Sequence, residues 1–81
     1  MELIDTIEMM QSEDHIERFK AEYYQAKIRY EKLEEALYKH EAGTLEYAFN
    51  CPVELLKDQK RYMEQYIRTL RVRAEIEHIE L

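Results

Sequence analysis

Cysteine, glycine and proline each occur once in these 81 residues, and tryptophan is missing altogether. The lone Cys51 excludes a disulfide bond within the chain, and the lone Gly43 excludes a glycine-rich loop of the kind that wraps a phosphate. No apolar run approaches the ~18 residues of a membrane-spanning helix, so we expect no contact with a membrane. Because no secretory signal peptide is recognisable either, we expect the protein to work in a reducing cytoplasm.

The chain has no excess of positive charge, because 18 Asp and Glu residues outnumber 12 Lys and Arg residues and the formal net charge is -6. We expect no binding to a nucleic acid duplex, because attraction to its phosphates needs a concentrated positive surface. The charge is unevenly spread, since residues 1–15 contain no Lys or Arg. Residues 52–73 reverse the balance and carry Lys57, Lys60, Arg61, Arg68, Arg71 and Arg73 against Glu54, Asp58 and Glu64.

What the chain does have is a helical pattern of apolar residues. They recur at three- and four-residue steps, as in a helix that packs along its whole length against another helix. This stripe comprises Ile16, Phe19, Tyr23, Ala26, Tyr30, Leu33, Leu37 and His40. With Ser12 as the expected N-cap and Gly43 as the expected left-handed stop, the pattern predicts a long helix over about residues 13–41.

Two further helices are predicted, one on each side of this one. A short amphipathic helix is expected over about residues 2–10, and Pro52 suits the first turn of a long helix over about residues 52–79. Residues 44–50 alternate apolar and less apolar side chains over too short a stretch for a sheet. We therefore expect an extended connection laid against the helices.

These elements predict an all-α fold, with a single helical-hairpin domain over residues 1–81. Two long helices joined by so short a connection must run antiparallel. The helix expected over 52–79 carries two neighbouring apolar stripes, and one partner helix can cover only one of them. The second stripe comprises Leu55, Tyr62, Tyr66, Thr69 and Ile76. It predicts a helical homo-oligomer, with the dimer as the default.

The sequence offers no catalytic constellation, and we expect neither an enzyme nor a cofactor. Glu75 and His78 have the Glu-x-x-His spacing of carboxylate-bridged metal sites, but no second copy and no further inward carboxylates accompany them. We therefore predict no metal. Cys51 begins a helix, where a thiol pKa is lowered, yet no His or Asp stands near it in the sequence.

Basic and aromatic side chains that share helical faces are the candidate binding residues. Tyr24 lies one turn from Lys20 and from Lys27, so a ring could stack on a base while an ammonium meets a phosphate. Arginine is suited to bidentate contact with phosphate, and three arginines recur along the later helix. The candidate ligand-binding residues are thus Tyr24, Lys20, Lys27, Arg61, Arg68 and Arg71. The alternative is that these cations form ordinary intrahelical pairs, such as Lys27 with Glu31 or Arg68 with Glu64.

Several segments also carry a resemblance to known proteins. They are AEYYQAKIRYEKLEEAL in the first long helix, Gly43-Thr44-Leu45, Asn50-Cys51-Pro52, the Glu54-Leu55-Leu56 run and Arg73-Ala74-Glu75-Ile76-Glu77. In these segments the chain resembles a family of small helical proteins from bacteriophages and Bacillota prophages, related to an uncharacterised product of a crAss-like phage. Its size and hairpin architecture are similar to those of phage anti-defence sponges, which are oligomers that sequester nucleotide second messengers of bacterial immunity.

The resemblance implies a function without catalysis in the cytoplasm of a host bacterium. The protein would be a phage or prophage anti-defence protein that withholds a cyclic oligonucleotide or a cyclic ADP-ribose type of signal. The alternative is a protein-binding inhibitor or adaptor that blocks a host defence protein through its helical surface. A structural or assembly role in the virion is a third interpretation.

Overall fold

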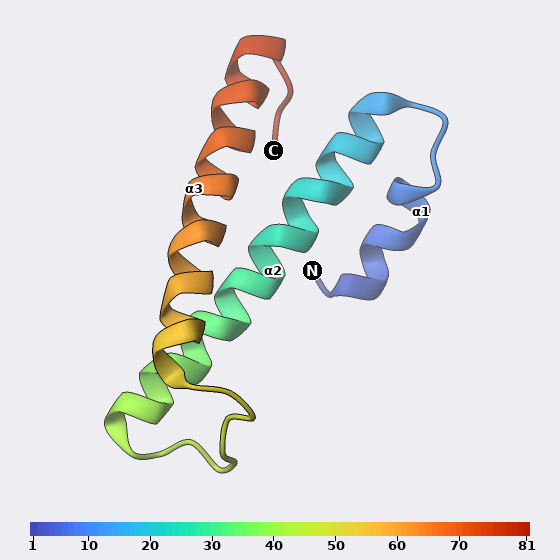
Figure 1. Cartoon of the computed structure of the whole chain (residues 1–81). Coiled ribbons are helices and arrows are strands. Elements are labelled where there is room, and N and C mark those ends of the chain that lie inside the picture. The colour runs from blue at the N-terminus through green and yellow to red at the C-terminus, as the bar shows by residue number, and fades with distance from the viewer.

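Two long antiparallel helices, α2 (His15–Ala42) and α3 (Val53–Glu77), form a hairpin in the computed structural model, which describes all 81 residues (Figure 1). A 3₁₀ helix, η1 (Leu3–Thr6), runs directly into the short α1 (Ile7–Met10), which lies beside α2 on the side away from α3. There is no strand, and the molecule measures 43 × 24 × 18 Å. The all-helical prediction is confirmed. None of the helices combines the length and the apolar character that crossing a bilayer requires.

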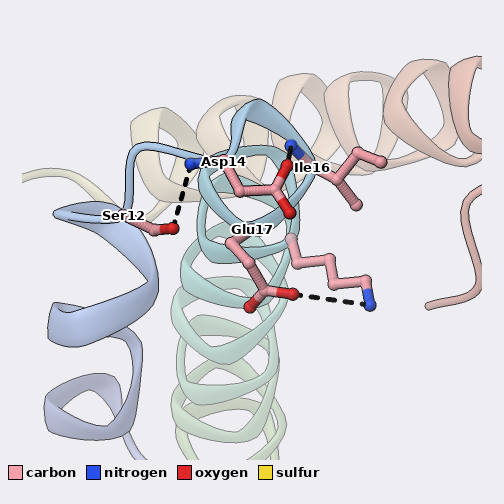
Figure 2. Close-up of polar contacts among 5 residues, drawn as sticks. Ser12, Asp14, Ile16 and Glu17 are labelled. Atoms are coloured by element: carbon pink, nitrogen blue, oxygen red, sulfur yellow. Dashed lines mark hydrogen bonds and ion pairs between the residues drawn. The ribbon is translucent and has the colours of Figure 1, made fainter.

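The N-terminus of α2 is capped by Asp14, so the prediction of Ser12 as the cap is wrong (Figure 2). The carboxylate of Asp14 accepts the backbone N–H of Ile16 at 2.9 Å, which satisfies a donor that has no partner within the helix. The Ser12 hydroxyl accepts the N–H of Asp14 instead, at 3.1 Å. Ser12 therefore orders the turn before the cap, and the helix begins at His15, two residues later than expected.

Both long helices end on a residue in the left-handed conformation. Gly43, with φ 78°, stops α2 as predicted, and the Thr44 N–H donates to the Lys39 carbonyl at 2.8 Å. At the end of α3 the same role falls to His78, with φ 56°, and the Ile79 N–H donates to the Ala74 carbonyl at 2.8 Å. This cap ends α3 at Glu77, two residues earlier than expected.

The connection between the long helices contains turns and bends and no strand, as expected. Phe49 is half-buried, and its ring centroid lies 5.2 Å from that of His40. Tyr47 is exposed, although its ring meets Phe49 edge-on at 6.1 Å. The segment thus lies against the last turns of α2 through one aromatic side chain.

The core lies at the open end of the hairpin, which is the end away from the connection. Its buried cluster comprises Phe19, Tyr23, Leu70 and Ala74, and Tyr24, Ile67 and Ile79 pack against it. Only 8 of the 81 residues are buried, which is a small core for a chain of this length. The first predicted stripe is therefore correct in the positions that face α3, whereas its end members Ile16 and His40 are exposed.

The N-terminal segment docks on a different face of α2. The fully buried Thr6 donates its hydroxyl hydrogen to the Leu3 carbonyl at 2.7 Å and accepts a hydrogen bond from the Gln25 amide at 3.0 Å. Ala21 and Ile28 are buried and share a helical face with Gln25 through steps of four and three residues. Their burial follows from the docking of this segment.

The second apolar stripe predicted on α3 is uncovered in the single chain. Leu55, Tyr62, Tyr66 and Ile76 expose 46% to 71% of their surface. The homo-oligomer that this stripe led us to expect stays a prediction.

Candidate functional site

A cleft of about 950 Å³ lies at the open end of the hairpin, along the C-terminal half of α3 and the residues that follow it. We call it the α3 cleft. It is lined by Glu64, Ile67, Arg68, Arg71, Val72, Ala74, Glu75, His78, Ile79, Glu80 and Leu81. Charged side chains of both signs therefore stand beside apolar ones.

The left-handed His78 builds one wall of this cleft. Because the chain reverses at His78, the last residues leave the axis of α3 and turn back towards α2 (Figure 1). Ile79 then packs on the buried cluster that contains Leu70 and Ala74, which fixes the reversed segment in place. The apolar contact between Ile79 and Ala74 is the one that usually accompanies this type of helix end.

Arg68 and Arg71 have no carboxylate within ion-pair distance. The other two arginines of α3 do, since Arg61 contacts Asp58 at 2.8 Å and Arg73 contacts Glu77 at 3.5 Å. Both arginines of the cleft thus keep all their N–H donors for a ligand or for water. The two pairs considered from the sequence, Arg68 with Glu64 and Lys27 with Glu31, do not form.

Glu64, one helical turn before Arg68, has a partner on α2. The Tyr30 hydroxyl of α2 is hydrogen-bonded to Glu64 of α3, and it also lies 2.8 Å from a carboxylate oxygen of Glu34. The pKa of Tyr30 is raised well above its ordinary value, first by the hydrogen bond to Glu64, then by burial and by Glu34. Lys60 contacts Glu34 at 3.6 Å and adds positive charge to this group.

The side chains of the cleft can recognise a ligand that is anionic at one end and a hydrogen-bond donor at another. Guanidinium groups bind phosphate oxygens through parallel N–H donors. Carboxylates such as Glu75 and Glu80 can accept hydrogen bonds from sugar hydroxyls or amino groups. The apolar Ile67, Val72 and Leu81 offer surface for a flat ring. No group of three or more His, Cys, Asp or Glu side chains is arranged to hold a metal ion.

The structure brings together two of the six residues proposed from the sequence, Arg68 and Arg71. Arg61 lines a second cleft of about 620 Å³ towards the connection, together with Tyr38, Lys57 and Lys60 among others. There the Arg61 guanidinium donates a hydrogen bond to Asp58, and this contact raises the pKa of Arg61.

The three candidates on α2 lie outside the α3 cleft. Tyr24 is half-buried and meets the Tyr23 ring edge-on, with the centroids 5.3 Å apart, so one side of its ring is already used in packing. Lys20 lies 3.9 Å from Glu17, and Lys27 is exposed without an ion-pair partner.

Sequence reasoning missed the cluster around Lys60. Its ammonium lies 5.7 Å from the centre of the Tyr38 ring and 6.0 Å from that of Tyr30. The signal was present, because Lys60 lies between Leu56 and Met63 in the other apolar stripe of α3, which faces α2. A lysine ammonium between two helices is stabilised by a carboxylate or by an aromatic ring, and Lys60 has contacts of both kinds.

The fold and the cleft define a small helical-hairpin protein whose cleft contains two guanidinium groups without ion-pair partners. The chain belongs to the Sequestin family, which matches residues 13–76 and so spans all of α2 and α3 except Glu77. The family name denotes the sequestration of a ligand. Neither a curated protein nor a solved structure gives a significant match to this chain.

Proposed function

We propose that this Sequestin-family protein binds and withholds a nucleotide second messenger of bacterial immunity without cleaving it. The ligand is of the cyclic oligonucleotide or cyclic ADP-ribose type, and the protein serves a phage or prophage against the defences of its host in the bacterial cytoplasm. Membership of the family supports sequestration. The chemistry of the α3 cleft supports a nucleotide as the ligand.

The observation that carries the proposal is the unpaired state of Arg68 and Arg71 in the α3 cleft. An arginine that already pairs with a carboxylate must give up that partner to bind a phosphate, whereas these two give up only water. Glu64, one helical turn before Arg68, is hydrogen-bonded to Tyr30 and forms no ion pair with Arg68. The pair is thus set up to accept the phosphates of a ligand.

The other cleft residues fit the remaining parts of a nucleotide. Glu75 and Glu80 accept hydrogen bonds from ribose hydroxyls or from a base amino group, as acidic residues do in other nucleotide sites. Ile67 and Val72 pack against the base. Because carboxylates repel a ligand that is anionic throughout, we expect inorganic phosphate alone to bind weakly.

Calorimetric titration with a panel of cyclic oligonucleotides and cyclic ADP-ribose isomers tests the proposal. We expect at least one ligand to bind, and the R68Q/R71Q variant to lose 100-fold or more in affinity, since two charge-assisted contacts are removed. Arg29→Gln is the matched control, because Arg29 is exposed on α2 and also lacks an ion-pair partner. Chromatography of the ligand released by heating should recover it unchanged.

Three outcomes count against the proposal. Absence of heat with every nucleotide would overturn it, and capture of one tight protein partner from a host lysate would then favour the adaptor interpretation. Recovery of a cleaved ligand would make the protein an enzyme. Loss of binding in R61Q together with full binding in R68Q/R71Q would show that the ligand binds in the second cleft.

A further inference from the structure

The N-terminal segment repeats the same order of side chains three times, as an acidic residue, a residue that packs inward and an exposed apolar residue. The triplets are Glu2-Leu3-Ile4, Asp5-Thr6-Ile7 and Glu8-Met9-Met10. Residues three apart eclipse one another in a 3₁₀ helix and share a face in an α-helix. Each kind of side chain therefore forms its own row along η1 and α1.

The inner row attaches the segment to α2. Thr6 is fully buried and accepts a hydrogen bond from the Gln25 amide at 3.0 Å, while Leu3 and Met9 are half-buried. This row fixes the direction in which the other two rows point.

The apolar row is not covered by any other part of the chain. Ile4 is 72% exposed, Ile7 is 42% exposed and Met10 is 47% exposed. Only the sulfur of Met10 has a polar contact, since it accepts a hydrogen bond from the Gln25 amide at 3.4 Å. From Ile4 to Met10 the row is roughly 10 Å long, which is the length of two turns of an α-helix. We call these three residues the N-terminal ridge.

The acidic row runs beside the N-terminal ridge and forms no ion pair within the chain. Asp5 uses Oδ2 to accept the backbone N–H of Glu2 at 2.8 Å, and Glu8 is exposed. No lysine or arginine precedes Arg18, whose guanidinium donates to the Ser12 carbonyl at 2.7 Å. The field beside the N-terminal ridge therefore attracts cations and repels anions.

We infer that the N-terminal ridge docks a basic amphipathic helix of a partner protein. The apolar side chains of that helix pack on the ridge, as the anchors of an amphipathic helix do in other complexes, and its lysines or arginines face the acidic row. Charge complementarity selects this occupant. The acidic row repels nucleic acids and anionic membranes, and a second copy of this chain carries a net charge of the same sign, -6.

The N-terminal ridge is separate from the α3 cleft. α1 lies beside α2 on the side away from α3, so α2 stands between the two surfaces (Figure 1). The family match begins at residue 13, and the ridge lies before it. The inference therefore goes beyond the proposed function and does not depend on it.

A synthetic basic peptide tests the inference on the full-length protein. The probe is a fluorescent peptide of about 18 residues, long enough to be helical alone, with leucines along one face and lysines beside them. In the control peptide, glutamate replaces every lysine. At physiological salt, which screens loose attraction between charges, we expect saturable binding of the basic peptide and none of the control peptide. Amide chemical shifts should change in residues 2–10 and not in α3.

Two variants test the two rows, and each has a matched control. I4S/I7S should lower the affinity for the basic peptide at least tenfold, whereas Ile76→Ser, which removes an equally exposed isoleucine from α3, should leave it unchanged. Glu8→Lys should lower the affinity at least threefold, whereas Glu46→Lys makes the same change of net charge in the connection and should have no effect. Because E8K keeps all the apolar residues, a loss seen in both variants does not come from unfolding of the segment.

Equal affinity of the basic peptide for the wild type, I4S/I7S and E8K would overturn the inference. Failure of the basic peptide to bind, equal binding of the control peptide, or shift changes confined to other residues would do the same. Self-association of the wild type that I4S/I7S abolishes would assign the N-terminal ridge to a second copy instead. Nucleotide binding should be unchanged in these variants, and its absence in the wild type would overturn the proposed function alone.

Discussion

The hydroxyl of Tyr30 is hydrogen-bonded to the carboxylate of Glu64, which lines the α3 cleft, and this contact joins α2 to α3. One bond thereby links the stability of the hairpin to the charge of the α3 cleft. Glu64 lines that cleft and also the second cleft towards the connection, so it stands between the two basic regions of α3.

Tyr30→Phe should lower the free energy of unfolding by about 1–2 kcal/mol, because a hydrogen bond to a charged group is lost without any change in apolar volume. It should also weaken binding of the proposed nucleotide, since the freed Glu64 can turn to Arg68. Urea unfolding and calorimetry measure the two effects. Tyr38→Phe is the control, because Tyr38 is 59% exposed and makes no hydrogen bond through its hydroxyl. Equal stability of the two variants would contradict the assigned role of Tyr30.

The stability of the protein should fall when the pH rises above about 10, the ordinary pKa of tyrosine. The pKa of Tyr30 is raised in the folded protein by Glu64, burial and Glu34. The pKa of Tyr66 is raised by burial and by a hydrogen bond to Glu22. A tyrosine whose pKa is higher when folded stabilises the protein fully below its unfolded pKa, and this stabilisation is lost as the pH rises towards the folded value. Unfolding measured between about pH 8 and 12 should show the decline, and Y30F should flatten it.

Leu70→Ala should be the most damaging of the simple truncations. Leu70 is 1% exposed at the centre of the cluster with Phe19, Tyr23 and Ala74. Truncating a buried leucine costs about 2–5 kcal/mol, which is a large part of the total for a chain of this size. Circular dichroism during thermal unfolding should show a much lower midpoint or no folded baseline. Ile4→Ala, at a position that is 72% exposed, should change the midpoint little.

Substitutions of the two left-handed residues, Gly43 and His78, should change the stability of the protein in opposite directions. Gly43→Ala should destabilise the protein by about 1 kcal/mol, because a Cβ is strained at φ 78° although it would meet no atom within 4 Å. His78→Gly should stabilise it by about 0.5–1 kcal/mol, because it removes the strain of a non-glycine residue at φ 56°. His78→Ala keeps the strain and controls for loss of the imidazole. A stabilising G43A would mean that the turn has another conformation in solution.

The fold could be predicted because the residues that define each helix and its ends are close together in the sequence. The apolar period, Gly43 and Pro52 predicted both long helices to within a few residues of their ends. The cap of α2 was misplaced because Ser12 and Asp14 are both good capping residues, and only the backbone geometry decides between them. The end of α3 was misplaced because a histidine in the left-handed region has no distinctive sequence signal.

The candidate site was only partly predictable. Arg68 and Arg71 were identified from charge, but the partner of Glu64 could not be, because Tyr30 lies more than thirty residues away from it in the sequence. Tyr24 was predicted to be free to bind a ligand because it lies off the main stripe of α2. In the structure its ring contacts that of Tyr23 and packs against the buried cluster at the open end. The direction in which a helical side chain leans is set by its neighbours on the other helix, and no spacing rule contains that information.

The docking of the N-terminal segment through Thr6 has a dynamic consequence. Two short helical elements attached to α2 around one buried hydroxyl form a unit that can detach without melting either long helix. Amide protons in the first eleven residues should then exchange with solvent well before those in the middle of α2. While the segment is detached, the side chains of Ala21 and Ile28 are exposed to solvent. The hairpin then has an additional apolar surface, which the docked segment otherwise covers.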